Sequence, residues 1–213
     1  MEEKQTNSNN KMNSFIDLHL HTNASDGTFT PSELVEQAKA KHIVSIAITD
    51  HDTVAGIDEA LEAGKKFNVE VIPGIEFSTE IDNISFHVVG LFVDHHDEKL
   101  LQLTSEIRNA RENRAKKIIE KVNALKVGPT ITFEEVSARA KGLIGRPHIA
   151  TVMIQKGYAK SIDEVFNKFL ERGAPCYVSR FKITPQEAVQ ILFEMNAIPI
   201  LAHPGLSPRD FNF

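Results

Sequence analysis

The sequence predicts an α/β barrel domain that carries a helical insertion. Strand-like and helix-like segments alternate up to about residue 93, and histidines or carboxylates follow several of the predicted strands. In α/β barrels, the loops at the carboxyl ends of the strands converge on one face, where active sites are built. A long charged helix and two further helix starts interrupt this pattern between residues 98 and 178. We therefore expect a catalytic barrel with a small helical part inserted into it.

The predicted elements of the first half follow from local signals. Residues 15–20 and 44–49 are rich in apolar and β-branched side chains and are predicted to be strands. Thr30, Pro31 and Glu33 form a capping box with proline at the first helical position, which predicts a helix start. The other predicted elements are a helix over residues 57–67, a strand over 69–72 that is ended by Pro73 and Gly74, and a strand over 84–93.

The second half begins with the charged helix, which we expect to run from Asp97 to about residue 125. Capping boxes at Thr132 and Ser161 predict two more helices, and Thr184 starts another. A strand over residues 198–202 then ends at His203. The candidate apolar positions of the long helix are Leu100, Leu103, Ile107, Ile118, Val122 and Leu125. The expected divisions are a disordered leader (1–14), a first barrel part (15–97), the insertion (98–178) and a barrel continuation (179–213).

Composition restricts the classes of function. The chain has 213 residues, of which 41% are hydrophobic and 25% charged, as in an ordinary globular protein. Its net charge of −5 gives no general reason to bind long nucleic acids. No apolar run reaches the roughly 18 residues of a membrane span, and the polar start lacks the apolar segment of a secretory signal. Cys176 is the only cysteine, so we expect a reducing, cytoplasmic setting.

A histidine pair gives the first sign of a metal site. His19 and His21 are two residues apart on a predicted strand, so both side chains point to one face. Imidazole together with carboxylate suits Zn, Mn or Fe. Taken alone, the pair could equally lie on an exposed strand face. However, five of the nine histidines fall at or near strand ends, which favours a metal centre. The candidate ligands are His19, His21, Asp26, His51, Glu76, His87 and His203.

Several spaced motifs resemble one family. They are Asp17-Leu18-His19-Leu20-His21-Thr22, Ser25-Asp26-Gly27, Ile48-Thr49-Asp50-His51-Asp52, Pro73-Gly74-Ile75-Glu76 and Ala202-His203-Pro204. In this order they resemble the PHP (polymerase and histidinol phosphatase) superfamily. The chain looks most like its nucleoside 3′,5′-bisphosphate phosphatases, which also act as 5′→3′ exoribonucleases. The resemblance covers everything after the leader, including the insertion.

The resemblance implies a distorted (β/α)₇ barrel, TIM-like, with up to three Mn²⁺, Fe or Zn ions. His19 and His21 would hold the first ion, and Glu76 would bridge it to the second. The second would be completed by His87 and His203, and the third would be held by Asp26 and His51. Asp17 would orient an imidazole from behind.

The family's chains normally continue past the Ala-His-Pro strand to a Gly-Ser-Asp-x-His motif that supplies two further ligands. No such pair occurs between Arg209 and Phe213. We therefore expect a barrel that is incomplete at the C-terminus, either as a fragment or as a naturally shortened protein.

A bisphosphate substrate needs cations outside the metal cluster. Arg146 and His148 come at a predicted helix start, which favours anions, and similar Gly-Arg-Pro-His patterns occur in the phosphatase branch of the family. The candidate substrate-binding residues are Arg146, His148, Arg111, Arg114 and Arg180. Alternatively, Arg111 and Arg114 form the solvated face of a charged helix. His95 and His96, followed by Asp97, look ligand-like, but we interpret them as a surface loop.

The predicted activity is hydrolysis of phosphate esters. Metal ions lower the pKa of water and neutralise phosphoryl oxygens, so we expect in-line attack by a metal-bridging hydroxide. The predicted substrates are 3′,5′-bisphosphonucleosides or the 5′ ends of short RNA. Two alternatives stay open. One is a phosphatase for another small phosphomonoester such as histidinol phosphate, and the other is a metal-binding but catalytically inactive module.

Overall fold

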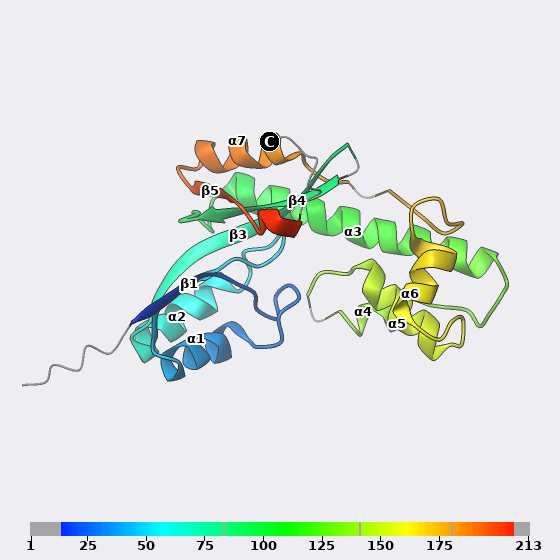
Figure 1. Ribbon diagram of the computed structural model, residues 1–213, viewed down its shortest axis with the longest axis horizontal. Helices are drawn as coiled ribbons and strands as arrows, with labels where there is room; N and C mark the ends of the chain where they lie inside the picture. Colours follow the sequence, from blue (N-terminus) through cyan, green and yellow to red (C-terminus); the bar gives the residue numbers. More distant parts are fainter. Residues whose placement is uncertain (1–13, 83, 141, 180, 207–213) are drawn as a thin grey trace, which may run out of the picture.

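A five-stranded sheet and a group of helices lie at opposite ends of the molecule, and helix α3 runs between them (Figure 1). The computed structural model describes residues 14–206 except 83, 141 and 180. Most of the predicted leader and the chain end from residue 207 to Phe213 lie outside the described residues. The elements are β1 (Phe15–Leu20), α1 (Pro31–Ala40), β2 (Ile43–Ile48), α2 (Ile57–Phe67), β3 (Glu70–Ile81), β4 (Ile84–Leu91), α3 (Glu98–Ala124), α4 (Phe133–Ser137), α5 (Arg146–Gln155), α6 (Ile162–Val165), the π-helix η1 (Phe166–Leu170), α7 (Pro185–Glu194), β5 (Ile198–Leu201) and the 3₁₀-helix η2 (Pro204–Leu206).

The sheet is curled and has the strand order β1-β2-β3-β4-β5. The pairs β1/β2 and β2/β3 are parallel, whereas β3/β4 and β4/β5 are antiparallel. Within the described residues β1 and β5 each have a single neighbour, so this part of the sheet forms a half-barrel. The α/β class is thus confirmed, while a complete (β/α)₇ barrel is not.

Strand β3 corrects one boundary of the sequence analysis. We expected Pro73 and Gly74 to end a strand, with Glu76 in the loop beyond. Instead β3 continues through both residues, because it pairs with β2 up to Pro73 and with β4 from Gly74 onward. A Cβ at Gly74 would lie 2.9 Å from the carbonyl oxygen of Gly90, so the glycine permits close approach of two strands. Glu76 therefore lies inside a strand.

The helix starts follow the predicted capping chemistry, with one exception. The side chains of Thr30, Thr132 and Thr184 each accept a hydrogen bond in a complete capping box. Ser161 accepts from the amide of Glu164, but the Glu164 carboxylate accepts from the amide of Lys160 at 2.8 Å instead. This last box is therefore only half formed. None of the described helices is long and apolar enough to cross a membrane.

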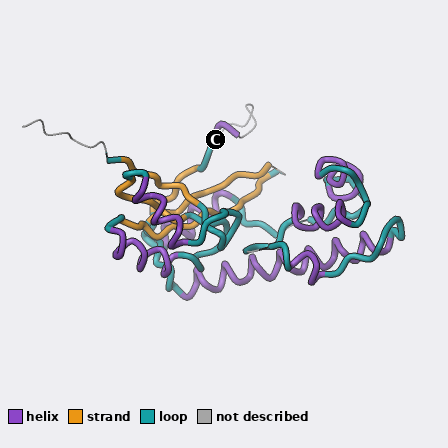
Figure 2. The backbone as a smooth tube through the Cα atoms, turned by 90° about the horizontal axis from the view of Figure 1, so that it is seen from below, coloured by secondary structure: helices purple, strands orange, loops and turns teal. Residues whose placement is uncertain are grey.

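Two hydrophobic cores are joined by α3. The first lies between the sheet and helices α1, α2 and α7, and it includes Leu100 and Ile107 from the first half of α3. The second lies in the helical lobe, which we define as the second half of α3 with α4, α5, α6 and η1, and it includes Ile118 and Val122. Leu125, predicted as a further apolar position, is 37% exposed because it lies at the C-cap of α3. Figure 2 shows α3 passing from one group of elements to the other.

Candidate metal centre

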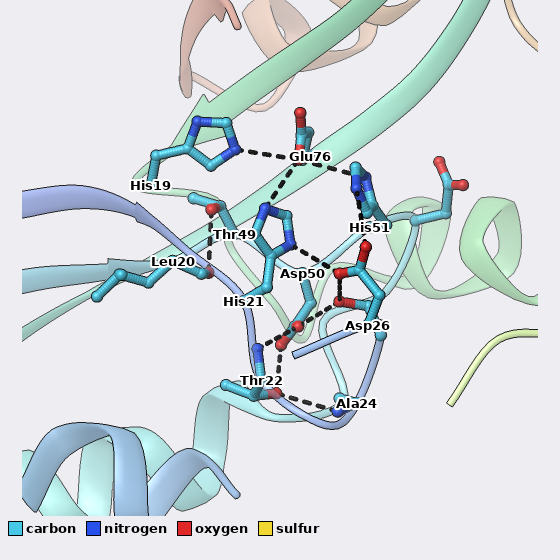
Figure 3. Close-up of polar contacts among 12 residues, drawn as sticks. His19, Leu20, His21, Thr22, Ala24, Asp26, Thr49, Asp50, His51 and Glu76 are labelled. Carbon is cyan, nitrogen blue, oxygen red and sulfur yellow. Dashed lines mark hydrogen bonds and ion pairs between the residues drawn. The ribbon is translucent and has the colours of Figure 1, made fainter. Parts of the chain in front are cut away.

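The carboxylate of Glu76 lies at the centre of a group of imidazoles (Figure 3). Its side chain is 1% exposed. The Oε2 atom lies 3.0 Å from His19 Nε2, 3.1 Å from His21 Nε2 and 3.2 Å from His51 Nδ1. Three imidazoles thus face a single carboxylate oxygen: His19 from β1, His21 from the residue directly after it, and His51 from the loop after β2.

The second oxygen of Glu76 faces two more imidazoles. Its Oε1 atom lies 2.9 Å from His87 Nδ1, on β4, and 3.0 Å from His203 Nε2, just after β5. Neighbouring ring centroids are 4.6 to 5.8 Å apart and close a circle around the carboxylate. We call Glu76 with these five histidines the imidazole cluster; they are His19, His21, His51, His87 and His203.

The predicted common face of His19 and His21 is present. His19 lies on β1 and His21 follows directly after Leu20, the last residue of that strand, and both rings point towards Glu76. The carbonyl oxygen of Leu20 accepts from the amide of Thr49 at 2.9 Å, which holds the end of β1 beside the end of β2. The period of two along a strand therefore delivers both rings to one side.

A buried aspartate shapes the loop after β1. Asp50 is 1% exposed, and its carboxylate accepts from the amide of Thr22 at 2.7 Å, from the Thr22 hydroxyl at 2.6 Å and from the Ser25 hydroxyl at 2.6 Å. A Cβ at Gly27 would lie 2.3 Å from the carbonyl oxygen of His21, so this turn requires glycine. These contacts fix the loop that carries Asp26.

Asp26 approaches the open side of the cluster. Its carboxylate oxygens lie 3.5 Å from His21 Nδ1 and 3.7 Å from His51 Nε2, and its side chain is 67% exposed. Burial acts to lower the pKa of His21, but the nearby carboxylates, Glu76 foremost, raise it above the ordinary value. Burial prevails at His51 and lowers its pKa.

The pKa of Glu76 lies well below its usual range. Burial by itself would raise this pKa, because it disfavours the charged form. Hydrogen bonds with His19, His21 and His87 and the charge of His51 outweigh that effect. The centre of the cluster is therefore an anion that is nearly removed from water.

The donor atoms of the imidazole cluster outnumber the hydrogen bonds that they can form with one another, so the cluster suits divalent cations. A carboxylate offers about four lone-pair positions, which cannot accept from five ring nitrogens. The Nδ1 atoms of His21 and His51 are buried, and although carboxylate oxygens lie 3.5 Å and 3.2 Å from them, neither atom makes a hydrogen bond within the described part of the chain. Imidazole nitrogens and carboxylate oxygens together are ligands for Zn, Mn or Fe. Three overlapping groups bring three donor atoms within 4.8 Å of one another: His19/His21/Glu76, His21/Asp26/His51 and His51/Glu76/His87.

Asp52 connects the imidazole cluster to α3. Its backbone has φ 52°, in the left-handed region that aspartate tolerates, and its amide donates to the carbonyl oxygen of Glu76 at 3.0 Å. Its carboxylate accepts from the amide of Ser78 at 2.8 Å and from the guanidinium of Arg111. The sequence motif around His51 contains Asp52 but assigns it no role, and Ser78 is not among the predicted site residues. The sequence signal for Asp52 is that it directly follows His51, which itself follows Asp50 at the end of a predicted strand.

Three arginines line a cavity of about 160 Å³ beside α3. Arg111 contacts Asp52, as described. Arg114 Nε donates to the carbonyl oxygen of Val178 at 2.8 Å, and the Arg146 guanidinium donates to that of Leu170 at 3.1 Å. Burial, then the charges of Arg146 and Arg111, lower the pKa of Arg114 to about 10. We call this the arginine pocket; Ala115, Ile118, Ile144, Gly145, Pro147 and Ile149 complete its lining.

The remaining predicted site residues have more modest positions. His148 Nδ1 accepts from the amide of Gly145 at 3.0 Å, so that nitrogen caps α5. Asp17 accepts from the amide of His19 at 3.4 Å, and its expected contact with an imidazole stays a prediction. Arg180 lies outside the described residues. The solvated-face alternative for Arg111 is wrong, because that side chain is 13% exposed and binds Asp52.

Comparisons with known proteins agree on one family. The chain matches the PHP domain model over residues 17–175. It is 35% identical over 188 residues to a 5′-3′ exoribonuclease of Haemophilus influenzae, covering 88% of this chain and 68% of that protein. It is 30% identical over 190 residues to a 3′,5′-nucleoside bisphosphate phosphatase of Chromobacterium violaceum, covering 89% and 67%. The chain thus spans about two thirds of the length of these relatives.

Two solved structures share the fold. One is described as an amidohydrolase from Chromobacterium violaceum with bound sulfate and no metal, with TM-score 0.76, 30% identity, and coverage of 93% of this chain and 69% of that one. The other is described as a metal-dependent phosphoesterase from Bifidobacterium adolescentis, with TM-score 0.75, 30% identity, and coverage of 90% and 68%. At the level of the family, the prediction of a metal-dependent phosphoric ester hydrolase is confirmed. The chain belongs to the PHP domain family.

Proposed function

We propose that the chain hydrolyses phosphate esters of nucleotides, either nucleoside 3′,5′-bisphosphates or the 5′ ends of short RNA. One observation carries this proposal. Asp52 links a carboxylate surrounded by five imidazoles to a cavity with three arginines, because its amide donates to the carbonyl oxygen of Glu76 and its carboxylate binds Arg111. The cluster suits metal cations, and the pocket suits an anion. A substrate with two phosphate groups matches both needs.

The imidazole cluster would hold up to three divalent ions, with Mn²⁺ as the proposed metal. His19 and His21 would bind one ion, and Glu76 would bridge it to a second that His87 and His203 complete. Asp26 and His51 would bind a third. When bound, such ions lower the pKa of water and offset the negative charge of the phosphoryl oxygens. The protein contributes the buried carboxylate of Glu76 at the centre and a ring of imidazoles around it.

The reaction is the addition of water across a phosphorus–oxygen ester bond. The bond from phosphorus to the leaving oxygen breaks, and a bond from phosphorus to the oxygen of water forms. One proton of the water ends on the leaving alcohol, and the other is released to solvent or to the product phosphate. Asp26, 67% exposed beside His21 and His51, is the carboxylate on the solvent side of the cluster.

The arginine pocket selects the substrate. Planar guanidinium groups bind phosphate through paired hydrogen bonds, and each charged hydrogen bond contributes about 1.5–3 kcal/mol. Arg114 and Arg146 belong to the predicted insertion, residues 98–178, which we propose supplies the contacts to the second phosphate. The relatives named as exoribonuclease and bisphosphate phosphatase support a nucleotide substrate.

The test is phosphate release from adenosine 3′,5′-bisphosphate, histidinol phosphate and p-nitrophenyl phosphate, each with Mn²⁺ and with EDTA. We expect turnover of the bisphosphate at a kcat/KM well above that of the two monoesters, and loss of turnover in EDTA. Glu62→Gln is a matched control for Glu76→Gln, since Glu62 is 73% exposed and forms a surface ion pair with Lys65 at 2.6 Å, away from the imidazole cluster. Equal turnover of all three substrates would contradict the nucleotide assignment. Metal binding without turnover of any of them would leave an inactive module.

A further inference from the structure

A second group of metal-ligating side chains lies outside the imidazole cluster. Asp58 belongs to the first turn of α2, and His95 and His96 lie between β4 and α3. The Oδ1 atom of Asp58 is 3.0 Å from His95 Nε2 and 3.3 Å from His96 Nε2. The two rings are 4.1 Å apart between centroids, and the three donor atoms lie within 4.8 Å of one another.

Asp97, which made this run look ligand-like in a sequence otherwise interpreted as a surface loop, is not the third donor. Asp97 follows the two histidines directly, but its carboxylate accepts from the amide of Leu100 at 2.9 Å and caps α3. Asp94, on the other side, accepts from the amide of His96 at 3.0 Å. The backbone that carries the histidines is therefore held at both ends, and the third donor, Asp58, comes from another helix.

The spacing of the donors fits a common ion. Two ligands of a tetrahedral ion with bonds of about 2.0 Å lie about 3.3 Å apart, close to both distances observed here. Two imidazoles directed at one carboxylate oxygen are also a combination that Zn²⁺ and similar ions accept. One carboxylate with two neutral imidazoles carries a net charge of −1, which suits a divalent cation.

We propose that Asp58, His95 and His96 form a peripheral site for a borderline transition-metal ion of the Zn²⁺ type. An ion bound there joins the start of α2 to the connection that leads into α3. The site has three protein donors and leaves a position open to solvent, because Asp58 is 70% and His96 is 67% exposed. The donors come from two separate segments and meet only in the folded chain. A bound ion therefore stabilises the fold, and we assign it no role in the hydrolysis.

The experiment counts metal ions. The full chain is equilibrated at a fixed, buffered concentration of free Zn²⁺, and bound zinc per chain is measured by elemental analysis. We expect His96→Ala and Asp58→Asn each to bind about one equivalent less than the unmodified protein. The matched control is His42→Asn, which replaces an exposed histidine of left-handed backbone with a residue that tolerates that conformation. It should retain the full zinc content.

Two outcomes would overturn the site: an unchanged zinc content in both variants, or an equal loss in His42→Asn. Circular dichroism checks that the variants are folded, and Asp58→Asn, an exposed and isosteric change, guards against a folding defect in His96→Ala. Zinc-induced stabilisation gives a second readout, since the rise in melting temperature with Zn²⁺ should shrink in both variants. Neither measurement requires turnover, so failure of the proposed hydrolase activity leaves this test intact.

Discussion

The imidazole cluster and the arginine pocket carry buried charges of opposite sign: the cluster is built around one carboxylate, and the pocket is lined by three guanidinium groups. In the cluster, one carboxylate that is 1% exposed is surrounded by five imidazoles. In the pocket, three guanidinium groups line one cavity, and the pKa of Arg114 falls to about 10 because of burial and the charges of its two neighbours. The cluster has more imidazole nitrogens than its one carboxylate can accept from, and the pocket has three guanidinium cations around one cavity. The cluster therefore suits metal cations, and the pocket suits an anion such as phosphate. A metal-bound phosphate ester would supply both.

The largest effect should come from the centre of the cluster. Glu76→Gln removes the anion on which five rings converge, and we expect loss of bound metal and a fall in activity of about a thousand-fold or more, equivalent to about 4 kcal/mol. Elemental analysis and phosphate release with Mn²⁺ measure the two effects. Glu62→Gln should leave both unchanged. Full metal content in Glu76→Gln would show that the rings bind ions without the central carboxylate.

The link between the two regions comes next. Asp52→Asn leaves the Arg111 guanidinium without its charged partner, and loss of one member of a buried pair costs about 3 kcal/mol. We expect the free energy of unfolding in urea to fall by that amount, with a raised KM for the bisphosphate. Asp163→Asn, at an exposed position of α6, is the control. Unchanged stability would mean that the cluster and α3 are held together by packing alone.

A change in the pocket alone should separate binding from metal content. Arg146→Ala removes one phosphate contact, worth about 2 kcal/mol, and we expect KM for the bisphosphate to rise about thirty-fold with metal content and kcat retained. Arg139→Ala removes an exposed arginine whose contacts are the carbonyl oxygen of Glu135 and the Gln155 side chain, and it should leave KM unchanged. A fall in kcat with unchanged KM in Arg146→Ala would place the arginine in the reaction step instead.

The smallest effects should come from the helix caps, and they should be equal in the two halves. Thr184→Ala removes the cap of α7 beside the sheet, and Thr132→Ala removes that of α4 in the helical lobe. Each should lower the free energy of unfolding by about 1 kcal/mol with activity retained. Urea denaturation measures the cost. Loss of activity in either variant would show that its helix helps to position a functional site.

The cluster was largely predictable because its signals are local. A period of two on a strand places His19 and His21 together, and chain position after strands marks His51 and His203. Capping boxes located the helices for the same reason, since Thr30 and Glu33 satisfy each other within one turn. What these residues share is a signal that is readable from a few neighbouring positions, even though Glu76, around which the rings gather, lies 127 positions from His203.

The rest depends on contacts between distant segments. Pro73 and Gly74 are usual strand breakers, and only the pairing of β3 with two strands of opposite direction explains why they lie within it. The bond from Arg111 to Asp52 spans 59 positions, and that from His95 to Asp58 spans 37. Neither has a periodic signature in the sequence. The three arginines were candidates from the sequence, but their meeting in one cavity, like the group at Asp58, is visible only in the folded chain.

Helix α3 belongs to both cores, and Asp52 binds its middle residue, Arg111, so a tilt of the helix about Arg111 would move each residue in proportion to its distance from that contact. Arg114 is three residues from Arg111, about 4.5 Å along the axis, whereas Ala124 at the far end is about 20 Å away. A tilt of about 5° therefore moves the far end by about 1.7 Å but the arginine by only about 0.4 Å. The proposed phosphate contact of Arg114 would therefore keep its place when the packing of the outer helices changes.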